Sequence, residues 1–334
     1  MPQFYFDAHC DTLSRLTHTG ASIQDNDFHI SLNKASVFAH YAQVFAIFND
    51  AGASFMKTRG TPMEFSTRLR AGEDVLDYDG AYKGYLAQRD TLRALLAQEE
   101  NRLALCLSAD DMERAWAEGK RAAILAVEGA EQLEKTTLAD AYADGVRLVT
   151  LTWNYPNSLG GSCLFGGGLT EKGRAFVHEA NRLGVAIDLS HGAEQLFWDT
   201  LEESRRPILA SHSNARTVCG HCRNLTDEQF MALVKAGGTA GINLYAEFLS
   251  KGKCTLSDVL AHIEHFFSLG GEDSVTLGTD FDGCDRVPEE IASVADMPKL
   301  ADALASHGYT DEQIEKIFYK NLLRVFREAT AKVE

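Results

Sequence analysis

The sequence predicts an α/β fold, and the arrangement that fits it best is a (β/α)₈ TIM barrel. Eight short runs of aliphatic, β-branched and aromatic residues recur along the chain, and stretches with apolar residues at helical spacing separate most of them. The length of 334 residues suits eight strand–helix units. Because no linker, internal repeat or low-complexity tract interrupts the pattern, we expect residues 1–334 to form a single domain.

The expected core strands are the apolar runs themselves: 4–9, 42–49, 121–128, 147–153, 186–190, 208–211, 239–244 and 274–280. The expected helices have apolar residues on one face: 83–99, 109–118, 136–144, 170–183, 226–236, 255–268 and 311–328. Thr170, Thr226 and Thr310 precede helical patterns and are typical residues at a helix start. Residues 103–108 form an additional short strand candidate outside the main alternation.

An open, doubly wound sheet is the alternative architecture for this alternation. Such a sheet carries a glycine-rich fingerprint after an early strand when it binds a dinucleotide. Here the glycines at 160–161 and 166–168 follow the fourth expected strand, and their spacing does not match that fingerprint. This comparison favours the barrel. We expect segment 160–168 to be either a mobile loop near a pocket mouth or simply a long turn.

Composition and charge exclude several classes of function. The formal net charge is −16 at pH 7, whereas binding to nucleic acid or to an anionic membrane surface requires a basic patch. No apolar run approaches the length of a membrane span, and the N-terminus lacks the signal-peptide pattern. We therefore expect a soluble, cytoplasmic protein. Its seven scattered cysteines predict free thiols rather than a disulfide framework.

Residues that can bind metal stand at the carboxyl ends of the expected strands. They are His9 and Asp11 at the first strand, Glu128 at the third, His191 at the fifth, His212 at the sixth and Asp280 at the eighth. In a parallel barrel these ends converge on one face. Three imidazoles and three carboxylates would repel one another or stay unsatisfied there without cations. Two Zn²⁺ ions fit these ligand types, with Glu128 able to give one oxygen to each.

The same residues lie in motifs that resemble those of the membrane (renal) dipeptidase family of zinc metallopeptidases, peptidase family M19, which has an amidohydrolase-like barrel. The motifs are Asp7-Ala8-His9-Cys10-Asp11, Val127-Glu128-Gly129, Asp188-Leu189-Ser190-His191, Ser211-His212-Ser213-Asn214-Ala215, Arg223-Asn224 and Gly278-Thr279-Asp280-Phe281-Asp282-Gly283. Their order and spacing match the family along nearly the whole chain. The combination is specific, although no single motif is.

The resemblance implies a binuclear zinc centre of the metallo-dependent hydrolase type. His9 and Asp11 would bind one zinc ion, His191 and His212 would bind the other, and Glu128 would bridge the two. A water or hydroxide between the metals would be the nucleophile, because two cations lower its pKa. No nucleophilic serine or cysteine is then required.

The resemblance also implies how a dipeptide is held. Asp280 corresponds to the family's acidic residue that meets the free amino group and passes a proton to the leaving nitrogen. Arg223 matches the family's clamp on the C-terminal carboxylate, a task that suits a guanidinium fork, and Tyr245 matches a tyrosine near that carboxylate. A site with an acid at one end and a cation at the other measures the length of a dipeptide. The implied substrates are LL and L-D dipeptides.

One position departs from the family pattern. Where animal members have a histidine after the fourth strand that contacts the substrate carbonyl region, this chain has Trp153, followed by Asn154. An indole carries no charge and donates one hydrogen bond. Asn154 offers a donor for the tetrahedral oxyanion in its place. We expect hydrolysis to survive this change, and we expect rate and substrate range to be what it affects.

Two other functions stay open on the sequence alone. One is a different amide hydrolase on the same scaffold, such as an N-acyl amino acid hydrolase, and the other is a non-catalytic metal- or peptide-binding relative. Arg223 and Asp280 favour a substrate with both termini free, which argues against the first. The complete ligand set argues against the second. The resemblance further implies that chains pair as homodimers.

Two further motifs are set aside. Cys219-Gly220-His221-Cys222 resembles half of a structural zinc site, but no second cysteine pair lies nearby in the sequence. His262 and His265 share a helix face without the glutamate of a metalloprotease helix, so we expect them to be surface or packing residues.

Overall fold

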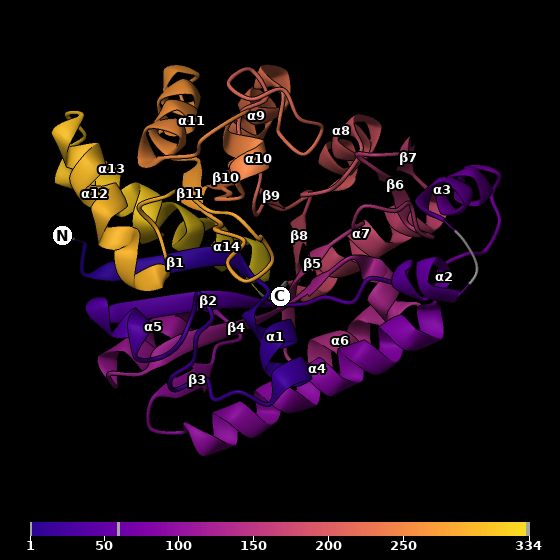
Figure 1. Cartoon of the computed structure of the whole chain (residues 1–334), viewed down its shortest axis with the longest axis horizontal. Helices are drawn as coiled ribbons and strands as arrows, with labels where there is room; N and C mark the ends of the chain where they lie inside the picture. The colour runs from indigo at the N-terminus through magenta and orange to yellow at the C-terminus, as the bar shows by residue number, and fades with distance from the viewer. Residues whose placement is uncertain (1, 59–60, 332–334) are drawn as a thin grey trace.

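Eight parallel strands close into a barrel in the computed structural model, which describes residues 2–58 and 61–331 (Figure 1). The strand order around the ring is β1, β2, β4, β5, β8, β9, β10 and β11, and β11 pairs with β1 to close it. Their bounds are Phe4–Cys10, His40–Ile47, Arg121–Glu128, Val146–Thr150, Ala186–Asp188, Leu209–Ala210, Thr239–Ile242 and Val275–Leu277, in that order. The predicted (β/α)₈ barrel is confirmed.

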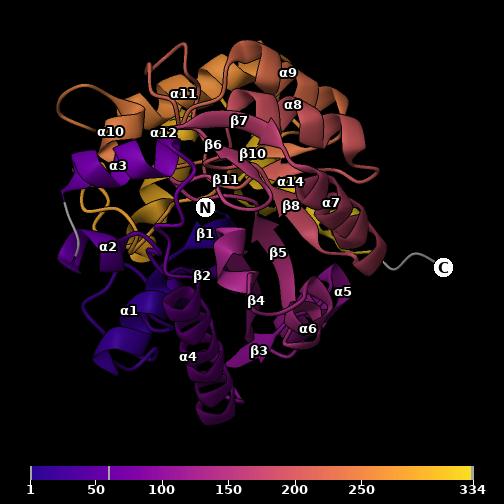
Figure 2. The same ribbon diagram turned by 90° about the vertical axis from the view of Figure 1, so that its right-hand side faces the viewer.

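Helices surround the ring of strands (Figure 2). Those that correspond to predicted helices are α4 (Tyr78–Gln98), α5 (Ala109–Ala117), α6 (Leu138–Ala143), α7 (Glu171–Leu183), α9 (Asp227–Lys235), α11 (Leu256–Ser268), α13 (Asp311–Glu315) and α14 (Asn321–Thr330). A π-helical turn, Lys316–Lys320, joins the last two. The side chains of Thr170, Thr226 and Thr310 each accept a hydrogen bond from a backbone N–H of the helix that follows, as N-caps do.

The sequence pattern missed several other helices. They are α1 (Thr12–Thr19), α2 (Ala53–Thr58), α3 (Pro62–Arg70), α8 (Glu194–Glu203), α10 (Ala246–Leu249) and α12 (Met297–Ser306). The remaining short turns are η1 (Lys34–Val37), η2 (Ala130–Leu133) and η3 (Val294–Asp296). Most of these elements are short, and a short segment shows too few turns for a helical period to stand out.

Several strands end before the apolar runs that predicted them. The run 147–153 ends as a strand at Thr150, and the run 274–280 ends at Leu277. The backbone of Asp280 has φ 60°, in the left-handed region, which a strand cannot contain. The short strand candidate 103–108 is present as β3 (Leu103–Leu105), which pairs with the start of β4 outside the ring.

The glycine-rich segment 160–168 is neither a loop nor a simple turn. It forms an antiparallel hairpin of β6 (Gly160–Ser162) and β7 (Gly166–Leu169). Gly167 has φ 104°, a conformation that strongly favours glycine, so glycine here permits a tight hairpin and does not merely add flexibility. The hairpin lies beside α8 at the edge of the barrel (Figure 1).

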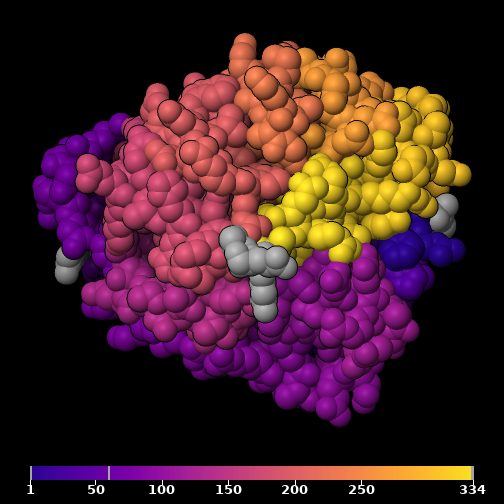
Figure 3. All heavy atoms as spheres, turned by 180° about the vertical axis from the view of Figure 1, so that it is seen from behind, coloured from indigo at the N-terminus to yellow at the C-terminus, as the bar shows by residue number. Residues whose placement is uncertain are grey.

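The C-terminal helices seal the end of the barrel at which the strands begin. The Asn321 side chain donates to the carbonyl oxygen of Val275, the first residue of β11, at 2.9 Å. Helix α14 also contacts β1, β8 and β10. In Figure 3 this C-terminal segment lies between the N-terminal part of the chain and the segment that contains α11. The opposite end, where the strands finish, is left for a site.

Within the described ranges, none of the helices combines the length and the apolar character needed to cross a membrane. All seven cysteines are free thiols in the structure, as predicted.

His262 is a packing residue in the core. The backbone N–H of Ala215 donates to its Nδ1 at 3.1 Å, and its Nε2 lies 3.0 Å from the carbonyl oxygen of Leu249. These contacts fix a neutral ring that donates through Nε2. Burial lowers the pKa of His262 to about 4. The ring joins the loop after β9 to α10, and both border the site described below.

This low pKa predicts a pH-dependent loss of stability. The folded pKa is depressed below the ordinary 6.5, so the stabilising share of His262 is complete above pH 6.5 and is lost as the pH falls towards about 4. The loss amounts to about 3 kcal/mol. We expect His262→Gln to be less stable than wild type at pH 7, with the gap closing towards pH 4. Urea unfolding at each pH measures this, with the exposed His307→Gln as control; parallel wild-type and H262Q curves would contradict it.

Candidate metal centre and substrate cavity

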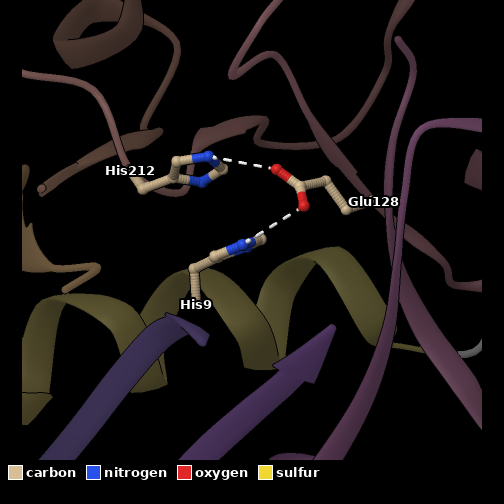
Figure 4. Close-up of side chains that lie close together, drawn as sticks. All are labelled: His9, Glu128 and His212. Atoms are coloured by element: carbon tan, nitrogen blue, oxygen red, sulfur yellow. Dashed lines mark ion pairs between the residues drawn. The ribbon is translucent and has the colours of Figure 1, made fainter. Parts of the chain in front are cut away.

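The candidate ligands lie together at the carboxyl end of the barrel strands. His9 is in β1, Asp11 follows that strand directly, and Glu128 is the last residue of β4. His9 Nε2 lies 3.6 Å from Asp11 Oδ2 and 3.7 Å from Glu128 Oε2. Figure 4 shows the Glu128 carboxylate between the imidazoles of His9 and His212, with a different oxygen facing each ring. A carboxylate placed in this way can bridge two cations.

His212 is oriented by a chain of hydrogen bonds that ends on a buried carboxylate. Ser211 Oγ donates to Asp188 Oδ2 at 2.6 Å and lies 2.7 Å from His212 Nδ1. Because the hydroxyl has given its only proton to Asp188, it accepts from Nδ1–H of His212. The Nε2 atom of His212 is therefore unprotonated in the neutral ring and turned towards Glu128, at 3.4 Å from Oε1.

His191 is fixed in the same tautomer by a different partner. Its Nδ1 lies 2.9 Å from Asn154 Oδ1, an acceptor, so Nδ1 carries the proton. Its Nε2 lies 3.0 Å from His212 Nε2 and 2.9 Å from Glu128 Oε1. Burial lowers the pKa of both histidines well below the ordinary value, which keeps them neutral. Two lone pairs and a carboxylate oxygen thus converge on one point, which is favourable only around a cation.

Buried atoms without partners complete this donor set. Both ring nitrogens of His9 and Oδ1 of Asp11 are buried and have no hydrogen-bond partner among the described residues. Gly283 stands where a Cβ would collide with the carboxylates of Asp11 and Asp280, so glycine keeps that space open. Imidazole and carboxylate groups with such unused lone pairs are metal ligands. The residues present therefore fit a divalent metal.

The charges in the cluster depend on one another. Burial works against a charge on His9, but the neighbouring carboxylates of Glu128, Asp11 and Asp280 raise its pKa to about 10. Burial raises the pKa of Glu128 well above its ordinary value. His9 and Glu128 thus both tend to keep a proton, because several carboxylates and imidazoles lie close together in a buried place. A metal cation supplies the same compensation without a proton.

Asp280 lies beside the cluster in a strained conformation. Its Oδ1 is 4.0 Å from His9 Nε2, and its Oδ2 accepts a hydrogen bond from Asn243 Nδ2 at 3.0 Å. Burial is the main cause that raises the pKa of Asp280 to about 6. Asp280, His191 and Asp282 are the non-glycine residues with positive φ in the described part of the chain. Strain of this kind concentrates at functional sites.

Two buried aspartates hold the strands that carry the ligands, and motif analysis gave neither of them a role. Asp7 in β1 accepts hydrogen bonds from Thr279 N at 3.0 Å and Thr279 Oγ1 at 2.6 Å, which ties β1 to the end of β11. Asp188 in β8 does the same with Ser211 N at 2.7 Å, after β9. The sequence did contain a signal, because a carboxylate inside an apolar strand must find donors.

The Ser211 bridge gives a testable prediction. Ser211→Ala removes the acceptor of His212 Nδ1–H, so we expect the affinity for a divalent metal ion to fall about 10- to 100-fold, as is usual when the partner of a ligand histidine is lost. Competition with a chromophoric chelator measures the affinity. Thr150→Val is the matched control, because Thr150 also donates to Asp188 Oδ2 at 2.6 Å without contacting a ligand. Equal affinity in the two variants would mean that Ser211 does not orient the ligand.

A cavity of about 510 Å³ opens beside the cluster. Its wall includes Asp11, Glu128, His191 and Asp280, together with the predicted substrate residues Trp153, Asn154 and Tyr245. The Trp153 ring packs against Phe48, with 4.7 Å between ring centroids, and forms an apolar part of the wall. A more open hollow of about 1000 Å³, lined by residues around 219–221, 246–254 and 285–291, contains no candidate ligand.

Arg223 is a buried cation without a carboxylate partner in the described structure. Its Nη1 donates to Ser213 Oγ at 3.3 Å and its Nη2 donates to the His212 carbonyl oxygen at 3.2 Å, while its Nε has no partner. The guanidinium carbon lies 5.4 Å from the ring centroid of Phe248, which lines the cavity. The ring of Tyr245 packs edge-on against Phe248 at 4.8 Å. A positive group therefore stands behind this wall.

Comparison with known proteins identifies the family. The model of the membrane dipeptidase family, peptidase family M19, matches residues 3–334. The chain belongs to this family. It is a dipeptidase-class hydrolase whose family membership implies a bound metal.

Relatives of this M19 dipeptidase occur in bacteria and yeast. It is 38% identical over 251 residues to an uncharacterized protein in the pqqA 5′ region of Klebsiella pneumoniae, a match that covers 71% of this chain and 92% of the other. It is 35% identical over 256 residues to an uncharacterized dipeptidase of Schizosaccharomyces pombe, covering 73% of this chain and 62% of that longer protein.

Solved structures agree with the M19 assignment along the whole barrel. A metallopeptidase from Rhodobacter sphaeroides, crystallised with a phosphinate mimic of the dipeptide L-Ala-D-Ala, superimposes with a TM-score of 0.85 at 29% identity and covers 98% of this chain and 99% of its own. The dipeptidase AC, a metallopeptidase of family M19, gives a TM-score of 0.83 at 28% identity and covers 99% of each chain.

Proposed function

We propose that this M19 enzyme is a zinc-dependent dipeptidase whose substrates are dipeptides with free amino and carboxyl termini. In this proposal His9 and Asp11 would hold one zinc ion, His191 and His212 would hold the second, and Glu128 would contribute to both. The two ions, when bound, would polarise the scissile carbonyl and lower the pKa of a water molecule. The rest of the work falls to side chains that bind the two ends of the substrate and move a proton.

The observation that carries the proposal is the uncompensated guanidinium of Arg223. A buried charge without a partner costs several kcal/mol, so the arrangement favours binding of an anion. Two of its nitrogens already donate to Ser213 and to the backbone of His212, and Nε is still unused. The terminal carboxylate of a dipeptide supplies the missing charge, and a guanidinium can bind it through charge-assisted hydrogen bonds. Tyr245 and Phe248 flank this end of the cavity.

Asp280 is proposed to serve the other end of the substrate. The amide of Asn243 holds Oδ2, which leaves Oδ1 on the side of the metal centre. As a carboxylate it would bind the substrate ammonium group, and a carboxyl group in this position can also take up and release a proton. Asp280 would take the proton released when water attacks the carbonyl and give it to the leaving nitrogen.

We include L-D dipeptides together with LL dipeptides in the substrate range. The Rhodobacter sphaeroides enzyme, which is similar over almost the whole chain, binds a mimic of L-Ala-D-Ala. The cavity wall of the present chain has Trp153 beside His191, with 6.0 Å between ring centroids. An indole at this place adds an apolar surface to the cavity wall and adds no charge. We therefore expect it to affect which substrate side chains the enzyme prefers, and not whether the peptide bond is hydrolysed.

The proposal is tested with a panel of LL and L-D dipeptides and their N-acetyl and C-amide derivatives. Purified enzyme is assayed after removal of metal with a chelator and again after addition of zinc. We expect activity only with zinc, metal analysis that gives two ions per chain, and hydrolysis of free dipeptides in preference to both blocked forms. Blocking either end removes a charge that Asp280 or Arg223 binds.

The alternative functions give different results in the same experiment. An N-acyl amino acid hydrolase on this scaffold would prefer the N-acetyl derivative, since that substrate needs no partner for an ammonium group. A non-catalytic relative would bind zinc and hydrolyse none of the compounds.

A further inference from the structure

A single buried asparagine contacts residues at both ends of the proposed substrate site. Asn243 follows β10 directly, and its side chain is fully buried. Strand β10 lies between β9 and β11 in the ring (Figure 1). His212 comes shortly after β9 and Asp280 shortly after β11, so Asn243 has a candidate metal ligand on one side and the proposed proton carrier on the other.

The amide nitrogen of Asn243 faces Asp280. Its Nδ2 donates to Asp280 Oδ2 at 3.0 Å. Within the described ranges, Asn243 is the residue that donates a hydrogen bond to this carboxylate. The orientation of the other oxygen, Oδ1, which lies on the side of the metal centre, therefore depends on this amide.

The amide oxygen of Asn243 faces the segment that carries Tyr245. The backbone N–H of Tyr245 donates to Asn243 Oδ1 at 2.6 Å, a side-chain turn that fixes the backbone two residues further along the chain. Helix α10 begins directly after Tyr245 and carries Phe248. Tyr245 and Phe248 both line the cavity, so this bond helps to place its wall at the carboxylate end.

Asn243 and Arg223 meet at one backbone oxygen. The carbonyl oxygen of His212 accepts from Arg223 Nη2 at 3.2 Å and from Asn243 Nδ2 at 3.4 Å. A carbonyl oxygen has two lone pairs, and these two donors use both. The guanidinium proposed to bind the substrate carboxylate and the amide that holds Asp280 are thus placed relative to the same atom.

The backbone of Asn243 is fixed by a second buried asparagine. Asn214 Oδ1 accepts from the backbone N–H of Asn243 at 2.9 Å, and Asn214 Nδ2 donates to the carbonyl oxygen of Asn243 at 2.9 Å. Both polar atoms of the Asn243 backbone and both of its side chain therefore have partners. A buried polar network whose members are all satisfied is rigid.

We propose that Asn243 is a positioning residue that sets the span between the ammonium-binding and the carboxylate-binding end of the substrate site, so that the enzyme selects dipeptides by their length. The inference rests on the proposed function, because it takes Asp280 and Arg223 as the groups that bind the two ends. Asn243 is not among the residues that line the cavity. It acts through Asp280 on one side, and through Tyr245 and the His212 carbonyl oxygen on the other.

A rigid span selects for length because a charge that is misplaced along the substrate cannot be followed by its partner. One additional methylene lengthens the substrate by about 1.5 Å of chain. A misplacement of about 1 Å can cost about 10²-fold in rate. If the partner of one charge were free to move, it would follow the displaced charge and the penalty would shrink.

The test compares three substrates of the zinc-loaded, full-length enzyme. They are L-alanyl-L-alanine, β-alanyl-L-alanine with one more methylene on the ammonium side, and L-alanyl-β-alanine with one more on the carboxylate side. We expect wild type to prefer the first over each of the other two by about 10²-fold in kcat/KM. Absence of these two preferences in an enzyme that hydrolyses L-alanyl-L-alanine would contradict selection by length.

The variant Asn243→Asp separates the two ends. Aspartate keeps the acceptor for the Tyr245 N–H but replaces the donor to Asp280 by an oxygen, and two neighbouring carboxylates repel each other. We expect the preference over β-alanyl-L-alanine to fall at least about 10-fold, while the preference over L-alanyl-β-alanine changes less than about threefold. Asn243→Ala removes both contacts, so both preferences should fall.

Asn321→Asp is the matched control. Asn321 is also buried, and its Nδ2 donates to two backbone oxygens, those of Glu272 and Val275, at the opposite end of the barrel. This variant shows what the loss of such a donor does to the fold as a whole, and we expect it to keep both preferences. Binding of a phosphinate mimic of L-Ala-D-Ala, measured by calorimetry, should be weaker in Asn243→Asp than in Asn321→Asp.

The outcomes distinguish this inference from the proposed function. If wild type shows both preferences and Asn243→Asp changes neither of them, or lowers both equally, the inference is overturned and the dipeptidase function stands. If circular dichroism shows that Asn243→Asp does not fold, Asn243→Ala decides, and unchanged preferences in that variant overturn the inference. A wild-type enzyme that hydrolyses no free dipeptide would contradict the proposed function itself, and the inference with it.

Discussion

Replacement of Glu128 by glutamine is expected to remove dipeptidase activity and most of the bound metal. Glu128 is the residue that faces three imidazoles, with oxygens 3.7 Å from His9 Nε2, 2.9 Å from His191 Nε2 and 3.4 Å from His212 Nε2. Glutamine keeps the shape but replaces one acceptor oxygen by an amide nitrogen that cannot bind a cation. A bound metal would lower the free energy of the transition state by several kcal/mol, so we expect kcat/KM to fall by about 10³-fold or more in this variant.

The Glu128→Gln experiment needs a variant that separates loss of metal from loss of structure. Glu131→Gln provides it: Glu131 is equally buried, lies in η2 three residues along the chain, and bonds Asn157 Nδ2 at 2.9 Å rather than a candidate ligand. We expect Glu131→Gln to retain metal and activity. Metal content is measured by elemental analysis and folding by circular dichroism. Full activity and an unchanged metal content in Glu128→Gln would contradict the role proposed for Glu128.

Replacement of Asp280 by asparagine is expected to lower kcat while the metal remains bound. Asparagine still accepts the hydrogen bond from Asn243, but it cannot carry a proton between water and the leaving nitrogen. Loss of a general acid–base group costs about 10²- to 10⁴-fold in rate. The same change removes the anion proposed to bind the substrate ammonium group, so KM for free dipeptides should rise as well.

Asp285→Asn is the matched control for this second prediction. Asp285 is exposed, lines the same cavity, and has no ion-pair partner within the part of the chain that the structure describes. Its loss should change kcat less than threefold. Steady-state kinetics on one free dipeptide, with metal analysis of each variant, gives the comparison. An Asp280→Asn enzyme with normal kcat and full metal content would show that another group moves the proton.

The sequence predicted well which segments form the barrel, because a buried strand appears in the local sequence as a run of apolar residues. Apolar runs such as 121–128 matched a strand to the residue, since that segment is buried along its length. Helices α8 and α12 were missed although each has ten residues, one more than α5 or α9, which were predicted. The predicted ends of β5 and β11 lie too far along the chain. The residues after Thr150 and Leu277 are still buried, although their backbone no longer pairs with a neighbouring strand. Burial and pairing are different properties, and sequence reports the first.

The candidate site also has features that the sequence predicted and features that it could not predict. The residue types at the strand ends were sufficient to nominate His9, Asp11, Glu128, His191 and His212, since parallel strands bring those ends together. The tautomers of the ligand histidines could not be read from the chain, because they depend on Ser211 and Asn154. Trp153 and Asn154 were considered only as substrate contacts. The structure adds that Asn154 orients a ligand.

The sequence by itself determined which parts the protein is built from. These are eight strands in order, a residue that can bind metal at the end of most of them, and a family pattern that runs through the chain. What only the tertiary structure decided is how side chains from distant segments pair. The surroundings of Arg223, which has no carboxylate partner among the described residues, and the acceptors that orient His191 and His212 belong to this second class. The physical reason is that periodicity indicates which residues are buried, whereas hydrogen bonds and ion pairs depend on how segments that are distant in the sequence are placed next to each other.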